Sequence, residues 1–168
     1  QLDATSIYQL KNEFRSLADV HHPNLVRLHE LFCDRECWFF TMDLVEGERF
    51  DTWVRPSPGS RLDEPRLRSA ILQLVDALEA IHGSGKLHRD VKPSNVLIRA
   101  DGRLAVLDFG LVIDPAAGSV GRTLSNTEIT GTPDYMAPEQ VLSQPATTAT
   151  GDAALGAMLY EALRGKRN

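Results

Sequence analysis

The sequence has 168 residues, of which 42% are hydrophobic, 24% charged and 7% aromatic, and its formal net charge is −5. This length and composition are typical of one folded domain and exclude a disordered, collagen-like or disulfide-scaffold chain. A mildly acidic chain is also a poor candidate for non-specific binding to nucleic acid or to a membrane surface through basic residues.

Hydrophobic spacing and turn residues predict the secondary structure in chain order. We expect a helix over 6–18, a β-hairpin from the extended runs 25–33 and 37–45, a helical turn over 50–54, a loop over 56–60, a helix over 63–82, strands at 96–99 and 104–107, a loop over 115–126 and a helix over 153–164. Ser6 with Gln9 has the pattern of a capping box, and Asp63 that of a helix N-cap. Asp101-Gly102 is typical of a short hairpin turn.

The ends of the chain and its cysteines give further expectations. No apolar run approaches the ~20 residues that a membrane-spanning helix needs. The first residues, Gln1-Leu2-Asp3, lack the basic and apolar regions of a signal peptide and include no initiator methionine, so we expect the chain to begin inside a longer gene product. Cys33 and Cys37, with His29 nearby, make a weak zinc or disulfide pattern, and we expect packed free thiols.

Three motifs follow one another in the second half of the chain. His88-Arg89-Asp90-Val91-Lys92-Pro93-Ser94-Asn95 lies between the predicted helix 63–82 and the second hairpin, Asp108-Phe109-Gly110 follows that hairpin, and Ala137-Pro138-Glu139 closes the loop beyond. In order, spacing and intervening elements, the sequence resembles the eukaryotic-type (Hanks-type) protein kinase family. The resemblance covers about residues 6–164.

The resemblance implies an α+β, two-lobed protein-kinase-like fold. No Gly-rich loop and no Val-Ala-Ile-Lys strand precede Glu13, and only one predicted helix follows Glu139. We therefore expect a fold truncated at both ends, with a partial small β lobe and a partial helical lobe. Residues 1–168 would form one partial kinase domain, with about 1–45 as the remnant of the small lobe and hinge and about 46–168 as the partial helical lobe.

The resemblance also implies catalytic roles. Asp90 would accept the hydrogen bond and the proton of a substrate hydroxyl, and Lys92 would place a cation near the transferred phosphoryl group. Asn95 and Asp108 would bind Mg²⁺, which prefers hard oxygen ligands. Thr132 would contact Asp90 and Lys92 and, like Lys92, resembles the serine/threonine branch. A lone Asp or Asn in a loop is usually a turn cap, but the family spacing of these residues favours the catalytic reading.

ATP would lie between the lobes. Glu13, nine residues before His22-Pro23, matches the glutamate that pairs with a phosphate-binding lysine. Met42 would wall the adenine pocket, and the backbone of Asp43 and Val45 would hydrogen-bond the purine edge. The remaining expected contacts are Glu48 at the ribose, Leu97 below the adenine and Asp108 at the metal.

Several positions resemble regulatory residues of the family. Arg89 would bind a phosphate on the activation loop, with a solvated arginine as the alternative. Phe109 would stack with His88, Leu17 and Leu28 in a hydrophobic spine. The candidate phosphosites are Thr123, Ser125, Thr127 and Thr130. Glu128 falls on the family's usual phosphothreonine position, so either Glu128 mimics a phosphate or Thr127 replaces it.

Two positions depart from the family pattern. The family has an aspartate that ties down the catalytic loop, residues 88–95, where this sequence has Gly151, or Asp152 if one residue is missing. The arginine that normally pairs with Glu139 would come from the absent region, and a buried unpaired carboxylate costs several kcal/mol.

We expect this sequence to be part of a Mg²⁺- and ATP-dependent protein serine/threonine kinase whose partners are proteins or peptides with Ser/Thr acceptors. No nucleic-acid partner is expected, and the need for ATP, with no signal peptide and no span, predicts the cytoplasm. The alternative is a truncated, pseudokinase-like binding module. A third reading, a kinase-fold enzyme acting on small molecules, is disfavoured by the peptide-seating segment 133–139.

Overall fold

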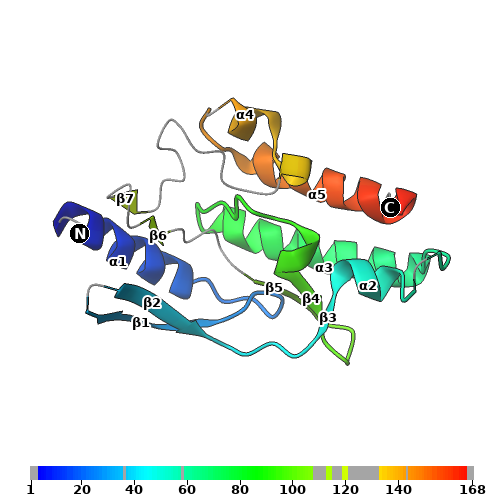
Figure 1. Ribbon diagram of the computed structural model, residues 1–168, viewed down its shortest axis with the longest axis horizontal. Coiled ribbons are helices and arrows are strands. Elements are labelled where there is room, and N and C mark those ends of the chain that lie inside the picture. Colours follow the sequence, from blue (N-terminus) through cyan, green and yellow to red (C-terminus); the bar gives the residue numbers. More distant parts are fainter. Residues whose placement is uncertain are drawn as a thin grey trace.

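The computed structural model describes residues 4–35, 37–57, 59–107, 113–114, 119–120, 133–142 and 144–165. Three longer helices lie beside three small antiparallel sheets (Figure 1). The elements are α1 (Ala4–Ala18), β1 (Leu28–Asp34), β2 (Cys37–Met42), β3 (Glu48–Arg49), α2 (Phe50–Val54), α3 (Glu64–Gly83), the 3₁₀ turn η1 (Pro93–Asn95), β4 (Val96–Ile98), β5 (Leu104–Val106), β6 (Ile113–Asp114), β7 (Ser119–Val120), the 3₁₀ turn η2 (Pro133–Tyr135), α4 (Pro138–Val141) and α5 (Thr148–Arg164). The predicted α+β class is confirmed.

Helix α1 covers one face of the β1–β2 hairpin. The Phe14 and Phe40 ring centroids are 6.0 Å apart, and Leu17 is buried in the core next to them. The helix begins at Ala4, so Ser6 lies inside its first turns and is buried. The predicted capping box at Ser6 is therefore wrong, because the helix starts two residues before the predicted start at residue 6.

Strands β1 and β2 form the predicted hairpin. Cys33 lies opposite Trp38, and Cys37 lies opposite Asp34. Side chains directly opposite one another share a face, and successive residues alternate between faces, so the two cysteines point to opposite sides. A disulfide between them would need the backbone to move. Both thiols are free and exposed, and the expectation that they are packed is wrong.

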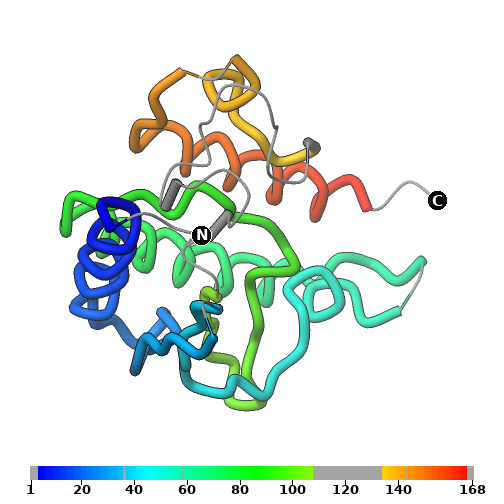
Figure 2. Tube along the Cα trace, turned by 60° about the vertical axis from the view of Figure 1, so that its left-hand side comes forward, coloured from blue at the N-terminus to red at the C-terminus, as the bar shows by residue number. Residues whose placement is uncertain are grey.

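Helix α3 packs against α2, β5 and α5, and Figure 2 shows α5 above it. The Asp63 side chain accepts a hydrogen bond from the Arg66 N–H at 3.0 Å, which confirms the predicted N-cap. The buried residues of the helix are Leu67, Ala70, Leu74, Ala77, Leu78 and Ile81. Strands β4 and β5 pair antiparallel as predicted, and Gly102, at φ 82°, supplies the left-handed residue of their connection.

Asn24 ties the segment before β1 to the β4–β5 hairpin and to α3. Its amide donates to the Leu104 carbonyl at 2.8 Å and to Gln73 Oε1 at 2.9 Å. Its carbonyl accepts from the Val106 N–H at 2.8 Å, and the Val26 N–H donates to the Val106 carbonyl at 3.0 Å. The β1–β2 hairpin is thereby joined to the rest of the molecule by side-chain and backbone bonds together.

Several other predicted bounds differ from the structure. The extended runs predicted over 25–33 and 37–45 are β1 (Leu28–Asp34) and β2 (Cys37–Met42). Helix α5 starts at Thr148, five residues before the predicted start, because Thr148 to Asp152 also adopt helical geometry. The predicted loop 115–126 contains strand β7, which pairs with β6, while its other residues lie outside the described part of the chain. Within the described ranges, no helix is both long and apolar enough to cross a membrane.

Replacing Asn24 with alanine should destabilise the fold. The change removes two side-chain hydrogen bonds and leaves the Leu104 carbonyl without that donor, so we expect the free energy of unfolding to fall by about 1–3 kcal/mol. Asn12→Ala, on the exposed face of α1, is the matched control and should not lower stability, since alanine is the better helix former. Urea titrations measure both, and equal effects would contradict the role of Asn24.

Candidate active site

Three of the predicted catalytic side chains meet in the loop between α3 and β4. Asp90 Oδ2 accepts a hydrogen bond from Lys92 Nζ at 2.6 Å and from Asn95 Nδ2 at 3.0 Å. The same Asn95 nitrogen donates to the Asp90 backbone carbonyl at 2.9 Å. The Lys92 and Asp90 side chains are 21% and 28% exposed, so the pair is sheltered but reachable. The sequence-predicted trio therefore forms one bonded cluster.

The loop is fastened to the end of β5. The Leu107 N–H donates to the Asn95 carbonyl at 2.8 Å, and His88 Nε2 lies 2.9 Å from the Leu107 carbonyl. His88 is almost fully buried, as are Leu17 and Leu28 in the core. Backbone pairing and a buried imidazole thus position the cluster on a rigid hairpin. The following predicted residues lie outside the described part of the chain: Asp108, Phe109, Thr123, Ser125, Thr127, Glu128, Thr130 and Thr132.

Arg89, just before Asp90, has a left-handed backbone with φ 62°. That conformation is strained for a residue other than glycine. Its carbonyl accepts a hydrogen bond from Gln140 Nε2 at 2.9 Å, and Gln140 Oε1 accepts from the Ala137 N–H at 3.0 Å. Helix α4, which follows the Ala-Pro-Glu motif, is therefore bonded to the catalytic loop.

Gly151, and not Asp152, takes the inward position on α5. It is buried, and a Cβ atom on it would lie 3.3 Å from His82 Nε2, whereas Asp152 is exposed. Glu139 accepts a hydrogen bond from Thr150 Oγ1 at 2.6 Å. The carboxylate of Glu139 therefore has a hydrogen-bond partner other than the expected arginine, and this bond lowers the pKa of Glu139 below its usual value.

The residues predicted to contact adenine follow the end of β2. Met42, opposite Leu28, closes the strand and is 44% exposed. The Asp43 N–H donates to the Arg27 carbonyl at 2.9 Å, so the Asp43 carbonyl is the backbone group that is left for a purine edge. Val45 is half-buried beyond it.

Strand β3 follows this segment and pairs antiparallel with β4. Glu48, which is exposed, pairs with Ile98, and half-buried Leu97 pairs with Arg49. A Cβ atom on Gly47 would lie 2.7 Å from the Ile98 carbonyl oxygen, so only glycine allows this approach. The pairing places Leu97 beside the β2–β3 connection, whereas nothing in the geometry directs Glu48 to one ligand group.

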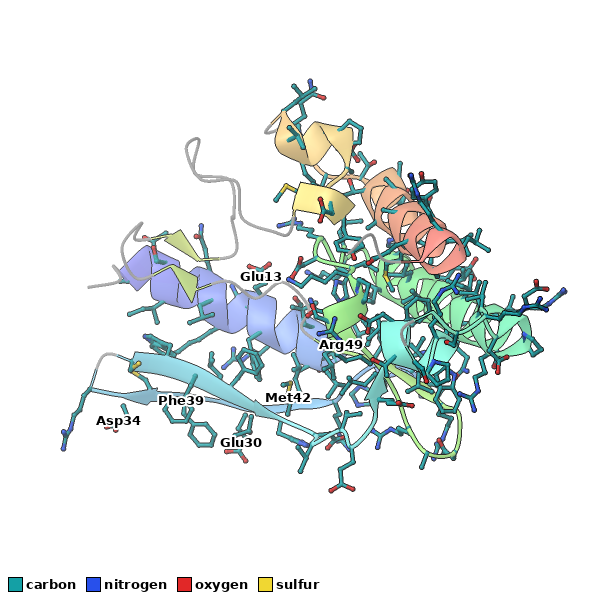
Figure 3. The ribbon with its side chains drawn as sticks, turned by 45° about the vertical axis from the view of Figure 1, so that its right-hand side comes forward. Glu13, Glu30, Asp34, Phe39, Met42 and Arg49 are labelled. Atoms are coloured by element: carbon teal, nitrogen blue, oxygen red, sulfur yellow. The ribbon has the colours of Figure 1, made fainter. Side chains whose placement is uncertain are left out.

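Glu13 lies on the side of α1 that is turned away from the β1–β2 hairpin (Figure 3). Burial raises the pKa of its carboxyl group, while the positive charges of Arg89 and Lys86 lower it by a smaller amount. The carboxylate therefore lies within electrostatic reach of the catalytic loop. The predicted partner, a strand lysine, has no counterpart in this sequence before Glu13.

A cavity of ≈ 590 Å³ opens between α2 and α5, with Pro93, Asp51 and Glu161 among its lining residues. Tyr135 of η2 donates a hydrogen bond to Glu161 Oε2. Burial, together with this hydrogen bond, raises the pKa of Tyr135 well above its usual range. The segment after residue 132 is thereby attached to α5 beside the catalytic loop.

The comparison with known families agrees with this geometry. A family model described as the protein kinase domain matches residues 2–168. The chain belongs to the protein kinase domain family. This confirms the resemblance drawn from the catalytic-loop, Asp-Phe-Gly and Ala-Pro-Glu motifs.

Relatives of this kinase domain occur in plants, fungi and bacteria. It is 38% identical over 159 residues to CBL-interacting protein kinase 8 of Oryza sativa subsp. japonica, covering 94% of this chain and 34% of the relative. It is 37% identical to serine/threonine-protein kinase PKH3 of Eremothecium gossypii, covering 92% of this chain and 21% of the relative. It is 34% identical to serine/threonine-protein kinase PkaA of Streptomyces coelicolor, covering 98% of this chain and 30% of the relative. The chain thus spans about a third or less of the length of these relatives.

Sequence reasoning missed three contacts of the kinase domain: Gln140 with Arg89, Thr150 with Glu139, and Tyr135 with Glu161. Each joins residues at least eleven positions apart, so no local spacing signals it. The only available signal for Gln140 was its place directly after the Ala-Pro-Glu motif.

Replacing Glu13 with glutamine should change how the stability of the kinase domain depends on pH. Because burial raises the folded-state pKa, the folded state holds the proton more tightly than the unfolded chain does. The stability this provides is fully present below the unfolded pKa and is lost as pH rises through the folded pKa.

We therefore expect Glu13→Gln to match the wild type in acid and to unfold at higher denaturant concentration near neutral pH. Denaturant titrations across this range measure the difference, with Glu79→Gln on the exposed face of α3 as the control. If the wild type instead became more stable than Glu13→Gln as pH rises, the raised pKa of Glu13 would be contradicted.

Proposed function

We propose that this chain carries the catalytic loop of an ATP- and Mg²⁺-dependent serine/threonine protein kinase. It would transfer the γ-phosphoryl group of ATP to a serine or threonine hydroxyl of a protein substrate. The observation that supports this best is the Asp90 carboxylate, bonded by Lys92 and Asn95 on a loop fixed to β5. The names of the relatives, which are serine/threonine-protein kinases, support the same activity.

In this proposal Asp90 orients the acceptor hydroxyl and takes its proton. Lys92 and Asn95 both bind Oδ2, which leaves Oδ1 to face a substrate. The hydroxyl oxygen forms a bond to the γ-phosphorus, the bond to the β-phosphate oxygen breaks, and ADP leaves. Lys92, fixed by its ion pair, keeps a positive charge next to the reacting phosphoryl group.

The residues fit Mg²⁺ and ATP. The side-chain nitrogen of Asn95 donates to Asp90, so its side-chain oxygen, a hard ligand, would be available to the metal. Asp108 is the second proposed ligand. When bound, Mg²⁺ neutralises charge on the phosphates. The proposed nucleotide contacts are Met42, the Asp43 carbonyl, the Val45 N–H, Leu97, Glu48 and, through a lysine, Glu13.

Protein substrates fit the surroundings of the cluster better than small molecules do. The segment 133–139 lies beside the catalytic loop and is attached to it through Gln140. We propose that Thr132 contacts Asp90 and Lys92, and that Arg89, Phe109 and the sites Thr123, Ser125, Thr127 and Thr130 regulate activity. We also propose a division into small-lobe and helical-lobe parts near residues 45 and 46, and the ATP-containing cytoplasm as the compartment.

Binding of ATP with Mg²⁺ should stabilise the natural full-length protein. At 100 times its Kd a ligand adds about 2.7 kcal/mol, which corresponds to a rise in Tm of several degrees. Thermal melts with ATP and Mg²⁺, with ATP and a chelator, and without nucleotide measure this. A Tm that does not respond to ATP and Mg²⁺ would favour the alternative, a binding module without kinase activity.

Asp90→Asn should abolish transfer and spare nucleotide binding. Loss of the proton acceptor is expected to lower kcat by about 10²–10⁴-fold. Assays with a Ser/Thr peptide mixture measure kcat, and titration with a fluorescent ATP analogue measures binding. Asp152→Asn, on the exposed side of α5, is the control. If nucleotide binding vanishes with Asp90→Asn, the carboxylate has a structural role instead.

A further inference from the structure

The peptide that precedes Asp90 is held in a conformation it would not adopt on its own. Arg89 has φ 62°, a left-handed value that is strained for an arginine and that it keeps only where neighbouring groups hold it. The orientation of this peptide sets the direction in which the next residue, Asp90, leaves the backbone. Whatever holds the Arg89 peptide therefore also aims the Asp90 carboxylate.

The side chain of Gln140 is one such holding group. Its Nε2 donates to the Arg89 carbonyl at 2.9 Å, and its Oε1 accepts from the Ala137 N–H at 3.0 Å. The two ends of the amide meet a carbonyl and an N–H, so only one orientation of the amide satisfies both. Both polar atoms of the Gln140 amide are therefore hydrogen-bonded, and the side chain is held in one position against the loop.

Helix α4 is in turn anchored to α5. Glu139, the neighbour of Gln140, accepts from Thr150 Oγ1 at 2.6 Å. Gly151, the next residue on α5, faces His82 and offers no side-chain polar atom of its own. The described bonds therefore lead from α5 through two successive residues of α4 to the catalytic loop.

We infer that Gln140 is a positioning residue for phosphoryl transfer, an inference that rests on the proposed kinase function. It touches neither the reacting atoms nor the metal site and acts through the Arg89 peptide on Asp90. Because it belongs to α4, directly after the peptide-seating segment, it also couples the position of that segment to the position of the carboxylate.

Two variants of the full-length protein test this. Gln140→Glu keeps the acceptor for the Ala137 N–H and places an oxygen where the donor to Arg89 was, and Gln140→Ala removes both bonds. We expect each to lower kcat about tenfold, the change that loss of one hydrogen bond to a held group produces, with the KM for ATP within about twofold of the wild type. Gln144→Ala, a nearby exposed glutamine, should change neither value.

A second measurement does not depend on activity. The Asp90 N–H donates to the His88 carbonyl at 2.8 Å, and its hydrogen exchange, followed by mass spectrometry of peptides spanning residues 87–92, reports how firmly the loop is held. Exchange should be faster in Gln140→Glu and Gln140→Ala and unchanged in Gln144→Ala.

The outcomes are distinguishable. Wild-type kcat and wild-type exchange in Gln140→Glu would overturn the inference, as would equal changes in Gln144→Ala. A fall in kcat accompanied by an equal fall in Tm across both variants and the control would assign Gln140 a purely structural role and also overturn it. A wild-type protein that transfers no phosphoryl group would remove the proposed function, while faster exchange in the variants would still support the positioning role of Gln140.

Discussion

The side-chain amide of Asn95 holds the site together. One nitrogen donates both to the backbone carbonyl and to the carboxylate of Asp90, so a single group fixes the start of the catalytic loop against its end. Asn95 is itself buried, and its backbone carbonyl is paired with the Leu107 N–H. A buried residue that makes several hydrogen bonds cannot move without breaking them together, which is why a short irregular loop can hold a carboxylate at a defined place.

Around this cluster, hydrogen bonds join segments that lie far apart in the sequence. Glu139, Gln140 and Tyr135 connect the peptide-seating segment to α5 and to the loop. Burial raises the pKa of Glu13 on α1, and the positive charge of Arg89 in the loop opposes this rise. The site is therefore not a property of the loop sequence alone, because residues from at least four elements determine its geometry and its field.

The sequence alone predicted the elements and contacts that depend on residues close together in the chain. The helix over α3, its Asp63 cap, both hairpins and the clustering of Asp90, Lys92 and Asn95 could be predicted from spacing, capping and motif. Prediction failed where tertiary contacts override local pattern. Ser6 has the right chemistry for a cap, yet the helix starts before it, and the partners of Glu139 and Gln140 come from distant segments that no spacing rule brings together.

Within the described residues, covalent and hydrogen-bonded connections between the β1–β2 hairpin and the β3–β5 sheet occur at two places, beside the packing of the shared core. One is covalent, the connection through Asp43 to Gly47, and the other is the pairing of residues 24–26 with Val106. Gly47 lies against the Ile98 carbonyl, so the end of the covalent link is close to β4. Two fixed points define an axis, and a rotation of the first part of the chain about it would swing Glu13 toward or away from the catalytic loop while leaving Leu97 and Asn95 at rest.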